Sequence, residues 1–504
     1  MTSKNETLIV NERQLSLPKE NIEKTFTISS FNILLQKLCT EKYFPYSANT
    51  DRKQGTRSKR IVDEMTFLNS DIFCLQEVDL LEILKKNFEG QYDFCFFNRP
   101  STFQLLQGRS SKRIDGVAVL LKKSKFKLIC QQIVDYNRLS ISIDPEYAKF
   151  IFKDAPLKET YKGENFEEAK ADDEESNFLN KVATLPNFLQ VFLTDNIGCL
   201  LCVEIIDPSI VPDADGTCNY RNIMFLASTH LYWDPVLDAL KTEQMRCLLR
   251  ELSIFRRKLL KELQTKEGEM AVREIGTFVC GDFNSLPDSN VYKLCTHSSL
   301  QLADYDVSKH EQLPKKESEE KERESDVYSM EEEILWKGIK EEKRKEQNEM
   351  DSLSHSYGSI LPLCSSYHQI LGAEPKYTNF TAGFKGCLDY VLFSPGTIGS
   401  KCEHGEISTS SATPTSNSST ESSSSLSLSE HPSSSSSSSS ASSSTSPSMT
   451  SSSVQSSVNP TLSCVGILLP PNDELLSQHV ALPSCRCGSD HISLQSFFKL
   501  FLGK

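Results

Sequence analysis

Six short polar signatures are spread along the chain, and their residue types could together hydrolyse a phosphate ester. Carboxylates and amides without a thiolate suit a hard divalent cation such as Mg²⁺. A water activated beside that cation would be the nucleophile for a phosphodiester or a phosphomonoester. The signatures are SFNIL, LQEV, THLYWDP, GDFNS, LDYV and SDHISL, with the candidates Asn32, Glu77, His230, Asp282, Asn284, Asp389, Asp490 and His491.

The functional group of each candidate suggests its part in that reaction. Glu77 is the natural metal carboxylate, and Asp282 is a candidate base for the water, with Asp490 to hold the water or orient His491. A histidine backed by Asp389 could stabilise charge that develops on phosphorus or assist the leaving oxygen. The remaining side chains are donors for nonbridging phosphate oxygens: Asn32, Asn284 and His230.

Each signature taken alone also has an ordinary structural explanation. A glutamate that closes a strand is usually solvated, an Asp-x-Asn after a strand is most often a turn or a helix cap, and a histidine there is usually a satisfied polar residue. The combination is different, because catalytic groups of layered α/β folds gather on loops at one edge of the sheets. We therefore expect these strand ends to converge.

The elements that must position these residues follow from apolar periodicity. The pairing of 115–123 with 126–134 is also expected. The predicted strands are 25–35, 71–78, 92–99, 115–123, 126–134, 187–195, 198–206, 221–229, 276–285, 387–394 and 491–500, and the predicted helices are 59–68, 80–88 and 236–266.

The domain organisation predicted from composition is one catalytic domain with two inserts. Residues 1–24 are polar and predict a flexible N-terminal arm, and residues 25–504 form the domain. The charge-dense segment 305–350 is one insert. The Ser-rich tract 403–463 is the other; it cannot bury enough apolar surface to offset its ordering entropy, so it is predicted to be disordered. Strands before and after the tract make it a loop insertion.

Charge and cysteine usage limit the class of protein. The formal net charge is −13, but residues 155–177 and 311–349 carry −5 each, so a local positive groove remains compatible with the rest. No secretory signal or membrane-length apolar run is seen, which predicts a reduced intracellular protein of the cytoplasm or nucleus without a membrane partner. Cys199 and Cys202 should point to opposite faces of a strand, which argues against zinc. Basic candidates for contact with a phosphate backbone are Lys53, Arg57, Lys59, Arg60, Arg109, Lys112 and Arg113.

The ordered set of signatures resembles the endonuclease/exonuclease/phosphatase superfamily of Mg²⁺-dependent phosphohydrolases. HLYWDP, RIVDEMTFLNSDIFCLQEVD and YTNFTAGFKGCLDYVLFS (377–394) further resemble its deadenylase/nocturnin branch. The resemblance covers about residues 25–500 apart from the inserts. It implies an α/β fold, a four-layered α-β-β-α sandwich with two packed mixed β-sheets, as in DNase I. Because no leucine-rich repeat precedes the domain, the chain is most similar to the stand-alone fungal RNA exonucleases of this branch.

The resemblance also implies roles for individual residues. Glu77 matches the metal ligand, and Asn32 lies in its supporting shell on the substrate side. Pro235 and Phe384 match the two residues that sandwich the terminal adenine in deadenylase relatives. Asp115 either lines the site or belongs to a plain turn before a strand. The catalytic positions of the family correspond to Asp282, Asn284, Asp389, His491, Asp490 and His230.

The activity implied is a Mg²⁺-dependent 3′–5′ exoribonuclease, with Mn²⁺ as an expected substitute. It would act as a monomer on single-stranded RNA 3′ ends in ribosomal RNA processing or mRNA decay, with poly(A) shortening as one form, and release nucleoside 5′-monophosphates. Two alternatives stay open: a nocturnin-like nucleotide phosphatase, and a non-catalytic scaffold. The scaffold is disfavoured because every acidic position is present.

Overall fold

The computed structural model describes residues 7–17, 22–107, 115–153, 174–211, 220–264, 271–296, 363–395 and 461–501. The charged insert at 305–350 and the Ser-rich tract up to 460 lie outside these residues, and so does the unit formed by 399–458. The tract was predicted to end at 463, but strand β13 begins at Thr461, so that boundary is wrong.

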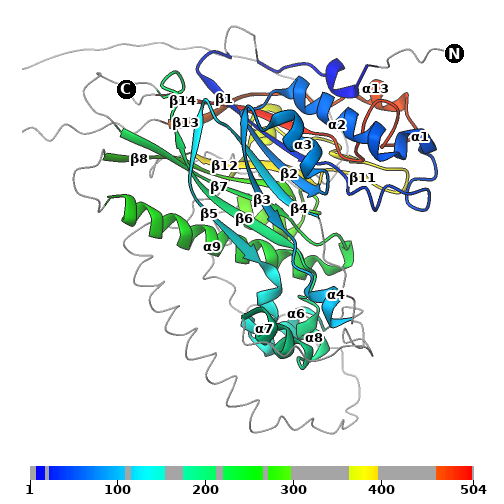
Figure 1. The fold of residues 1–504 in the computed structure, drawn as a ribbon, viewed down its shortest axis with the longest axis vertical. Coiled ribbons are helices and arrows are strands. Elements are labelled where there is room, and N and C mark those ends of the chain that lie inside the picture. Colours follow the sequence, from blue (N-terminus) through cyan, green and yellow to red (C-terminus); the bar gives the residue numbers. More distant parts are fainter. Residues whose placement is uncertain are drawn as a thin grey trace, which may run out of the picture. The chain divides into compact units, whose positions relative to one another are not determined.

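Two six-stranded sheets form the centre of the fold (Figure 1). In each sheet one neighbouring pair of strands is parallel and the other pairs are antiparallel, so both sheets are mixed. The first sheet has the order β13 (Thr461–Ile467), β14 (Leu494–Phe501), β1 (Thr25–Asn32), β2 (Ile72–Val78), β4 (Gly116–Lys122) and β3 (Tyr92–Asn98). The second has the order β5 (Phe126–Asp135), β6 (Ile197–Ile205), β7 (Tyr220–His230), β8 (Ala271–Asp282), β12 (Asp389–Pro395) and β9 (Cys364–Ser365).

Helices cover the outer face of each sheet. The apolar side of α2 (Gln54–Leu68) and that of α3 (Leu81–Phe88) pack with the outward residues of β1, β2 and β4. The long helix α9 (Asp238–Gln264) packs with α10 (Asn290–Thr296) on the outer face of the second sheet. The result is the predicted α-β-β-α sandwich (Figure 1). Outside these layers and the helices of the 102–190 region, short helices are η1 (Ile9–Glu12), α1 (Asn49–Arg52), η3 (Tyr136–Arg138), η4 (Pro235–Leu237), α12 (Ser366–Leu371) and α13 (Asp473–Ser477).

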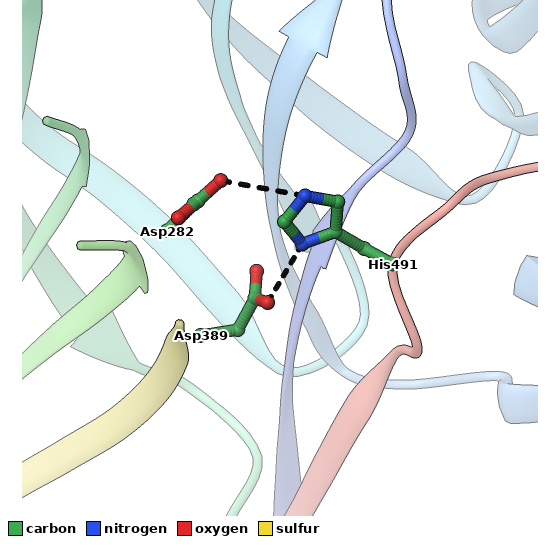
Figure 2. A group of neighbouring side chains, drawn as sticks. All are labelled: Asp282, Asp389 and His491. Atoms are coloured by element: carbon green, nitrogen blue, oxygen red, sulfur yellow. Dashed lines mark hydrogen bonds and ion pairs between the residues drawn. The ribbon is translucent and has the colours of Figure 1, made fainter. Parts of the chain in front are cut away.

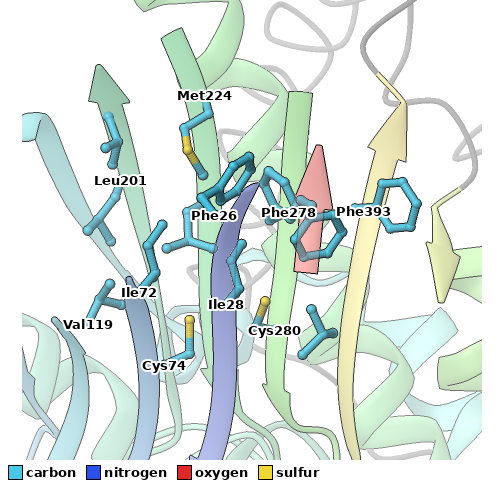
Figure 3. Packing of buried hydrophobic residues seen from close by; sticks show 14 of the residues in the cluster. Phe26, Ile28, Ile72, Cys74, Val119, Leu201, Met224, Phe278, Cys280 and Phe393 are labelled. Carbon is cyan, nitrogen blue, oxygen red and sulfur yellow. The ribbon is translucent and has the colours of Figure 1, made fainter. Parts of the chain in front are cut away.

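Aromatic and β-branched residues fill the space between the two sheets, as Figure 3 shows. The Phe26 ring stacks on that of Phe498 at 5.6 Å between centroids and meets the Phe278 ring edge-on at 6.0 Å. Cys199 lies in this inner cluster, whereas Cys202 lies under α9 on the other face of β6. The expectation that these two cysteines point to opposite faces is confirmed.

The predicted pairing of 115–123 with 126–134 is wrong. Strands β4 and β5 follow each other after a short turn in which Lys125 N–H donates to Lys122 O, but they belong to different sheets. Strand β4 pairs with β2 and β3, and β5 pairs with β6. The turn carries the chain from one layer to the other, and the alternation of apolar residues is the same whichever layer a strand joins.

The segment 187–195, predicted as a strand, is helical at its start. It forms α8 (Asn187–Gln190) and then a turn. With α4 (Thr102–Leu106), α5 (Leu139–Ser142), α6 (Pro145–Ile151) and α7 (Glu174–Ala183), it builds a small helical lobe around its own apolar cluster. Tertiary packing in that lobe overrides the strand preference of the β-branched and aromatic residues.

The N-terminal segment 7–17 is packed, which corrects the flexible arm predicted over 1–24. Ile9 and Val10 are buried, and Leu15 forms a β-bridge with Leu468. The guanidinium of Arg13 is buried and donates to the backbone oxygens of residues 468, 469 and 493. This segment therefore fixes the chain that leads into β14.

The register of the strands brings the signature residues to one edge. His230 and Asp282 are partners at the ends of the parallel strands β7 and β8, and Asp389 begins β12 opposite Asp282. Asn32 ends β1 and is paired with Gln76, next to Glu77 in the parallel strand β2. Within the part of the chain described, no helix has both the length and the hydropathy needed to cross a membrane.

Candidate active site

Asp282 lies at the centre of the site and is 1% exposed. Its Oδ2 accepts a hydrogen bond from Asn32 Nδ2 at 2.9 Å, and its Oδ1 accepts one from the backbone N–H of Asn284 at 2.8 Å. Burial raises the pKa of this carboxyl, and the neighbouring charge of Asp389 raises it further. The two histidine rings oppose this shift, with His230 Nε2 3.6 Å and His491 Nε2 3.7 Å from Oδ2.

Glu77 is directed into the same pocket by an irregular backbone. The pairing of β2 with β4 shifts register between Leu75 and Val78, and Glu77 has φ of 57° in the left-handed region. Bulges of this kind re-aim a side chain beside active sites. Glu77 Oε2 accepts from the Leu35 N–H at 2.7 Å, and Oε1 accepts from Asn32 Nδ2 at 3.2 Å.

Asn32 thus joins the two carboxylates that the sequence assigned to metal and water. Its Nδ2 lies 3.2 Å from Glu77 Oε1 and 2.9 Å from Asp282 Oδ2, so these oxygens are at most about 6.1 Å apart. This separation allows both carboxylates to face one cation-and-water pocket.

His491 and Asp389 form a buried pair next to Asp282 (Figure 2). His491 Nδ1 lies 2.8 Å from Asp389 Oδ2. Burial opposes a charge on the ring, but the carboxylates of Asp389, Asp282 and Asp490 outweigh burial and raise the pKa of His491 well above its ordinary value. The raised pKa favours the imidazolium, in which Nδ1 would donate to Asp389 and Nε2 would direct its N–H towards Asp282.

His230 flanks Asp282 from the second sheet in the opposite charge state. Burial is the main cause that lowers the pKa of His230 to about 4. The positive charges of Arg99 and His491 also lower it, whereas the carboxylates of Asp282 and Asp115 raise it. The His230 backbone oxygen accepts from Asn196 Nδ2 at 2.9 Å, which anchors the end of β7. The site thus places one neutral and one charged imidazole beside the same carboxylate.

Two groups of residues could hold a cation. The ligand atoms of Asp282, Asp389 and His491 lie within 4.8 Å of one another, but a cation there would compete with the proton that these carboxylates favour on His491. Glu77 and Asp490 fit a hard cation better. Asp490 is partly buried, and its inaccessible Oδ1 accepts no hydrogen bond from a described residue. Burial raises the pKa of its carboxyl and the charge of Glu77 raises it further, whereas His491 lowers it.

The predicted substrate residues lie at the mouth of this pocket. Pro235 at the start of η4 and Phe384 in the turn before β11 (Lys385–Gly386) both line a cleft of about 930 Å³, together with the catalytic candidates Glu77, Asp282 and His491. Phe384 is 41% exposed. The turn that carries Phe384 follows β10 (Asn379–Phe380). In it, the Phe384 carbonyl oxygen accepts hydrogen bonds from the backbone N–H and the hydroxyl of Thr381, and the Phe384 N–H donates to the same hydroxyl.

Asp115 also lines the cleft, where its carboxylate lies beside the Arg99 guanidinium. Asp115 is 5% exposed, with its Oδ2 3.5 Å from Arg99 Nη1. Gly116 next to it has no room for a side chain, because a Cβ there would come within 2.1 Å of the Phe97 carbonyl oxygen. Gly116 therefore allows β4 to lie close to β3, and Asp115 with Arg99 forms a charged part of the cleft wall.

Several residues of the site carried no strong sequence signal. Arg99 and Lys241 are cationic members of the cleft wall, and Lys241 Nζ donates to the Asn284 backbone oxygen at 2.8 Å. Asn196 lines the cleft as well, and Asn379 Nδ2 donates to Asp490 Oδ2 at 3.2 Å. The dipeptide Asp195-Asn196 before a strand was the one local pattern that could have indicated this wall.

Those basic residues predicted at the entrance that the structure describes are placed elsewhere. Arg57 is fully buried and cannot contact a phosphate backbone, and Arg60 pairs with Asp51 at 2.8 Å. Lys53 and Lys59 are exposed but do not line the cleft. Arg109, Lys112 and Arg113 lie outside the described residues.

A sandwich of two mixed sheets with a polar pocket at one edge is the architecture of the DNase I-like α/β class. The model of the Endonuclease/Exonuclease/phosphatase family matches residues 29–411, and the chain belongs to this family. The superfamily predicted from the signatures is therefore confirmed.

Curated relatives support the predicted branch. The chain is 25% identical over 410 residues to the CCR4-Not complex 3′-5′-exoribonuclease subunit Ccr4 of Candida glabrata, which covers 79% of this chain and 35% of that protein. It is 26% identical over 374 residues to Carbon catabolite repressor protein 4 homolog 4 of Arabidopsis thaliana, covering 73% and 67%. The chain thus spans about a third of the Candida relative's length.

Solved structures with a similar fold include ANGEL2, a 2′,3′-cyclic phosphatase, and the human Nocturnin catalytic domain. ANGEL2 matches with a TM-score of 0.48 and 16% identity, over 97% of this chain and 99% of that one. Nocturnin matches with a TM-score of 0.45 and 15% identity, over 98% and 99%.

Proposed function

We propose that the protein is a Mg²⁺-dependent 3′–5′ exoribonuclease that releases nucleoside 5′-monophosphates. The observation that carries this proposal is the arrangement around Asp282, whose Oδ2 lies 3.6 Å from His230 Nε2 and 3.7 Å from His491 Nε2, in a cleft that Pro235 and Phe384 also line. Similarity to Ccr4-type exoribonucleases supports RNA as the substrate.

The chemistry assigned to each group follows from its charge and position. Asp282 accepts the proton of the attacking water, because it is the buried carboxylate that both imidazoles face. His491, kept cationic by Asp389, stabilises negative charge on the phosphoryl oxygens as it develops. His230 and Asn284 orient the nonbridging oxygens, and the Asn284 side chain is aligned by the Leu231 carbonyl.

Glu77 and Asp490 would hold the Mg²⁺ ion, with Mn²⁺ as a substitute of the same oxygen-ligand preference. When bound, that ion would polarise the phosphate and neutralise part of the carboxylate charge gathered there. Asn32, whose Nδ2 touches both Glu77 and Asp282, keeps the two carboxylates in one orientation.

The cleft wall supports a nucleoside at the scissile end. Pro235 and Phe384 would hold the terminal base between them, and base stacking is worth about 1–3 kcal/mol per base and tolerates sequence. The proposed setting is ribosomal RNA 3′ processing or mRNA decay inside the cell, with a single-stranded 3′ end as the substrate.

The test is a cleavage assay with purified full-length protein on 5′-labelled oligo(A) and mixed-sequence RNA, with and without Mg²⁺. Ladder-like shortening that requires Mg²⁺ and falls at least 100-fold in Asp282→Asn and Glu77→Gln is expected. Glu82→Gln, on the exposed face of α3, makes the same chemical change away from the site and should retain full activity. Release of phosphate from a phosphorylated dinucleotide such as NADPH, without RNA shortening, would instead identify a nucleotide phosphatase.

A further inference from the structure

A large aromatic face remains open to solvent beside the catalytic pocket. The side chain of Trp233 is 66% exposed, compared with 41% for Phe384. Trp233 and Phe384 both line the cleft that holds Asp282 and His491. A tryptophan face at the rim of a phosphate-binding cleft is suited to stack on a flat heteroaromatic ring.

The backbone on both sides of Trp233 is fixed. Before it, the N–H of Tyr232 donates to Gln244 Oε1 at 3.0 Å, and the Tyr232 ring lies 6.0 Å from the Trp233 ring at a tilt of 46°. After it, the Asp234 side chain caps η4, which begins at Pro235. The backbone that carries the indole is thus fixed before a ligand binds, so the cost in conformational freedom on binding is limited to the Trp233 side chain itself.

Trp233 and Phe384 are supported by different parts of the fold. Tyr232, which precedes Trp233, packs with Leu237 against the apolar cluster of the helical lobe. Phe384 belongs to the β10–β11 hairpin and rests near Leu286, since a Cβ at Gly386 would meet both of their side chains within 3 Å. The cleft therefore has two separate aromatic supports, Trp233 and Phe384, whereas a single small base needs only one.

Phosphate-binding groups belong to the same cleft as both aromatic supports. His230, Asn284, Lys241 and Arg99 all contribute to its lining, and these are donors or cations rather than apolar contacts. A ligand with two bases joined through phosphate would use the polar groups and both aromatic supports at once.

We propose that Trp233 is the stacking platform of a second nucleobase subsite, so that the preferred ligand carries at least two bases linked through phosphate. This inference rests on the proposed function, which assigns the first base to Pro235 and Phe384. An oligonucleotide 3′ end and a pyrophosphate-linked dinucleotide share this chemistry. Loss of one stacked base should weaken binding of a two-base ligand about 5- to 150-fold.

The sequence offers a direct optical test. The chain contains two tryptophans, Trp233 and Trp336, and Trp336 lies outside the described residues. A full-length Asp282→Asn, Trp336→Phe protein is therefore inactive and reports on Trp233 alone. Its fluorescence is titrated, in Mg²⁺, with adenosine 5′-monophosphate, the dinucleotide ApA and NADP⁺.

Saturable quenching by a two-base ligand, with little or none from the mononucleotide, is the expected result, and the ligand with the lower dissociation constant in the titration identifies the source. In Asp282→Asn protein, Trp233→Ala should weaken that ligand at least fivefold and leave the mononucleotide within twofold, as measured by calorimetry. Tyr43→Ala is the matched control, since Tyr43 is 57% exposed and does not line the cleft.

Equal quenching by mononucleotide and dinucleotide, no quenching by any ligand, or an unchanged ratio of their affinities in Trp233→Ala would overturn the subsite. These outcomes are separate from failure of the proposed function. Wild-type protein that shortens RNA while Trp233→Ala binds normally refutes the subsite alone, and protein that cannot shorten RNA but shows the selective quenching refutes the nuclease assignment alone.

Discussion

Replacing the buried Arg57 should cost more stability than any single exposed charge on the same helix. Its guanidinium is fully buried and donates to four oxygens at 2.5 to 2.8 Å: the backbone oxygens of Ile33, Leu34 and Gly488, and Gln36 Oε1. Three of these acceptors lie in the loop after Asn32, and the fourth lies two residues before Asp490. Arg57 therefore ties the loop that leads to Asp490 to the loop whose Leu35 N–H holds Glu77.

The magnitude follows from the contacts. Hydrogen bonds to a charged group contribute about 1.5–3 kcal/mol each, so four give an upper bound of about 6–12 kcal/mol. Water and local relaxation will recover part of this in Arg57→Met, and removing one partner of a buried charged network typically costs about 3–5 kcal/mol. We expect a loss of about 3–5 kcal/mol in the free energy of unfolding.

Urea denaturation followed by circular dichroism, on full-length protein, measures this loss. Lys59→Met is the control two residues along α2, because the Lys59 side chain is 78% exposed and its ion pair with Asp63 should be worth less than about 1 kcal/mol. If Arg57→Met and Lys59→Met differ by less than about 1 kcal/mol, the assignment of Arg57 as the tie between these loops is refuted.

Three further results are expected. Removing the charge in Asp389→Asn should lower the pKa of His491, so that the ring titrates at lower pH in NMR of the metal-free protein; an unchanged titration would mean that Asp389 does not hold the imidazolium. Gly116→Ala should lose about 1–3 kcal/mol in urea denaturation because its Cβ meets the β3 carbonyl at 2.1 Å, whereas Gly55→Ala, with open space around it, should lose none; equal effects would contradict the close strand approach. Mg²⁺ should raise the thermal midpoint of the wild type by mass action and have much less effect on Glu77→Gln, and an equal rise in both would remove Glu77 as a ligand.

The candidate site was largely predictable because its residues stand in short motifs at strand ends. Glu77, Asp282 and His491 each follow or precede a strongly apolar run, so the strand boundary and the polar group were both visible. That Asn32 would bridge Glu77 and Asp282 was not, since the hydrogen bonds join strands 45 and 250 residues apart.

The sequence by itself determined most strands and helices, the order of the signatures and the class of chemistry, because these depend on local periodicity and residue type. Tertiary structure alone decided that β4 and β5 join different sheets, that 187–190 is helical within a lobe, and that Arg57 is a buried tie rather than a phosphate contact. It also decided that residues 7–17 pack against the chain before β14. Such choices depend on partners far away along the chain, and a local pattern is the same whichever partner a segment meets.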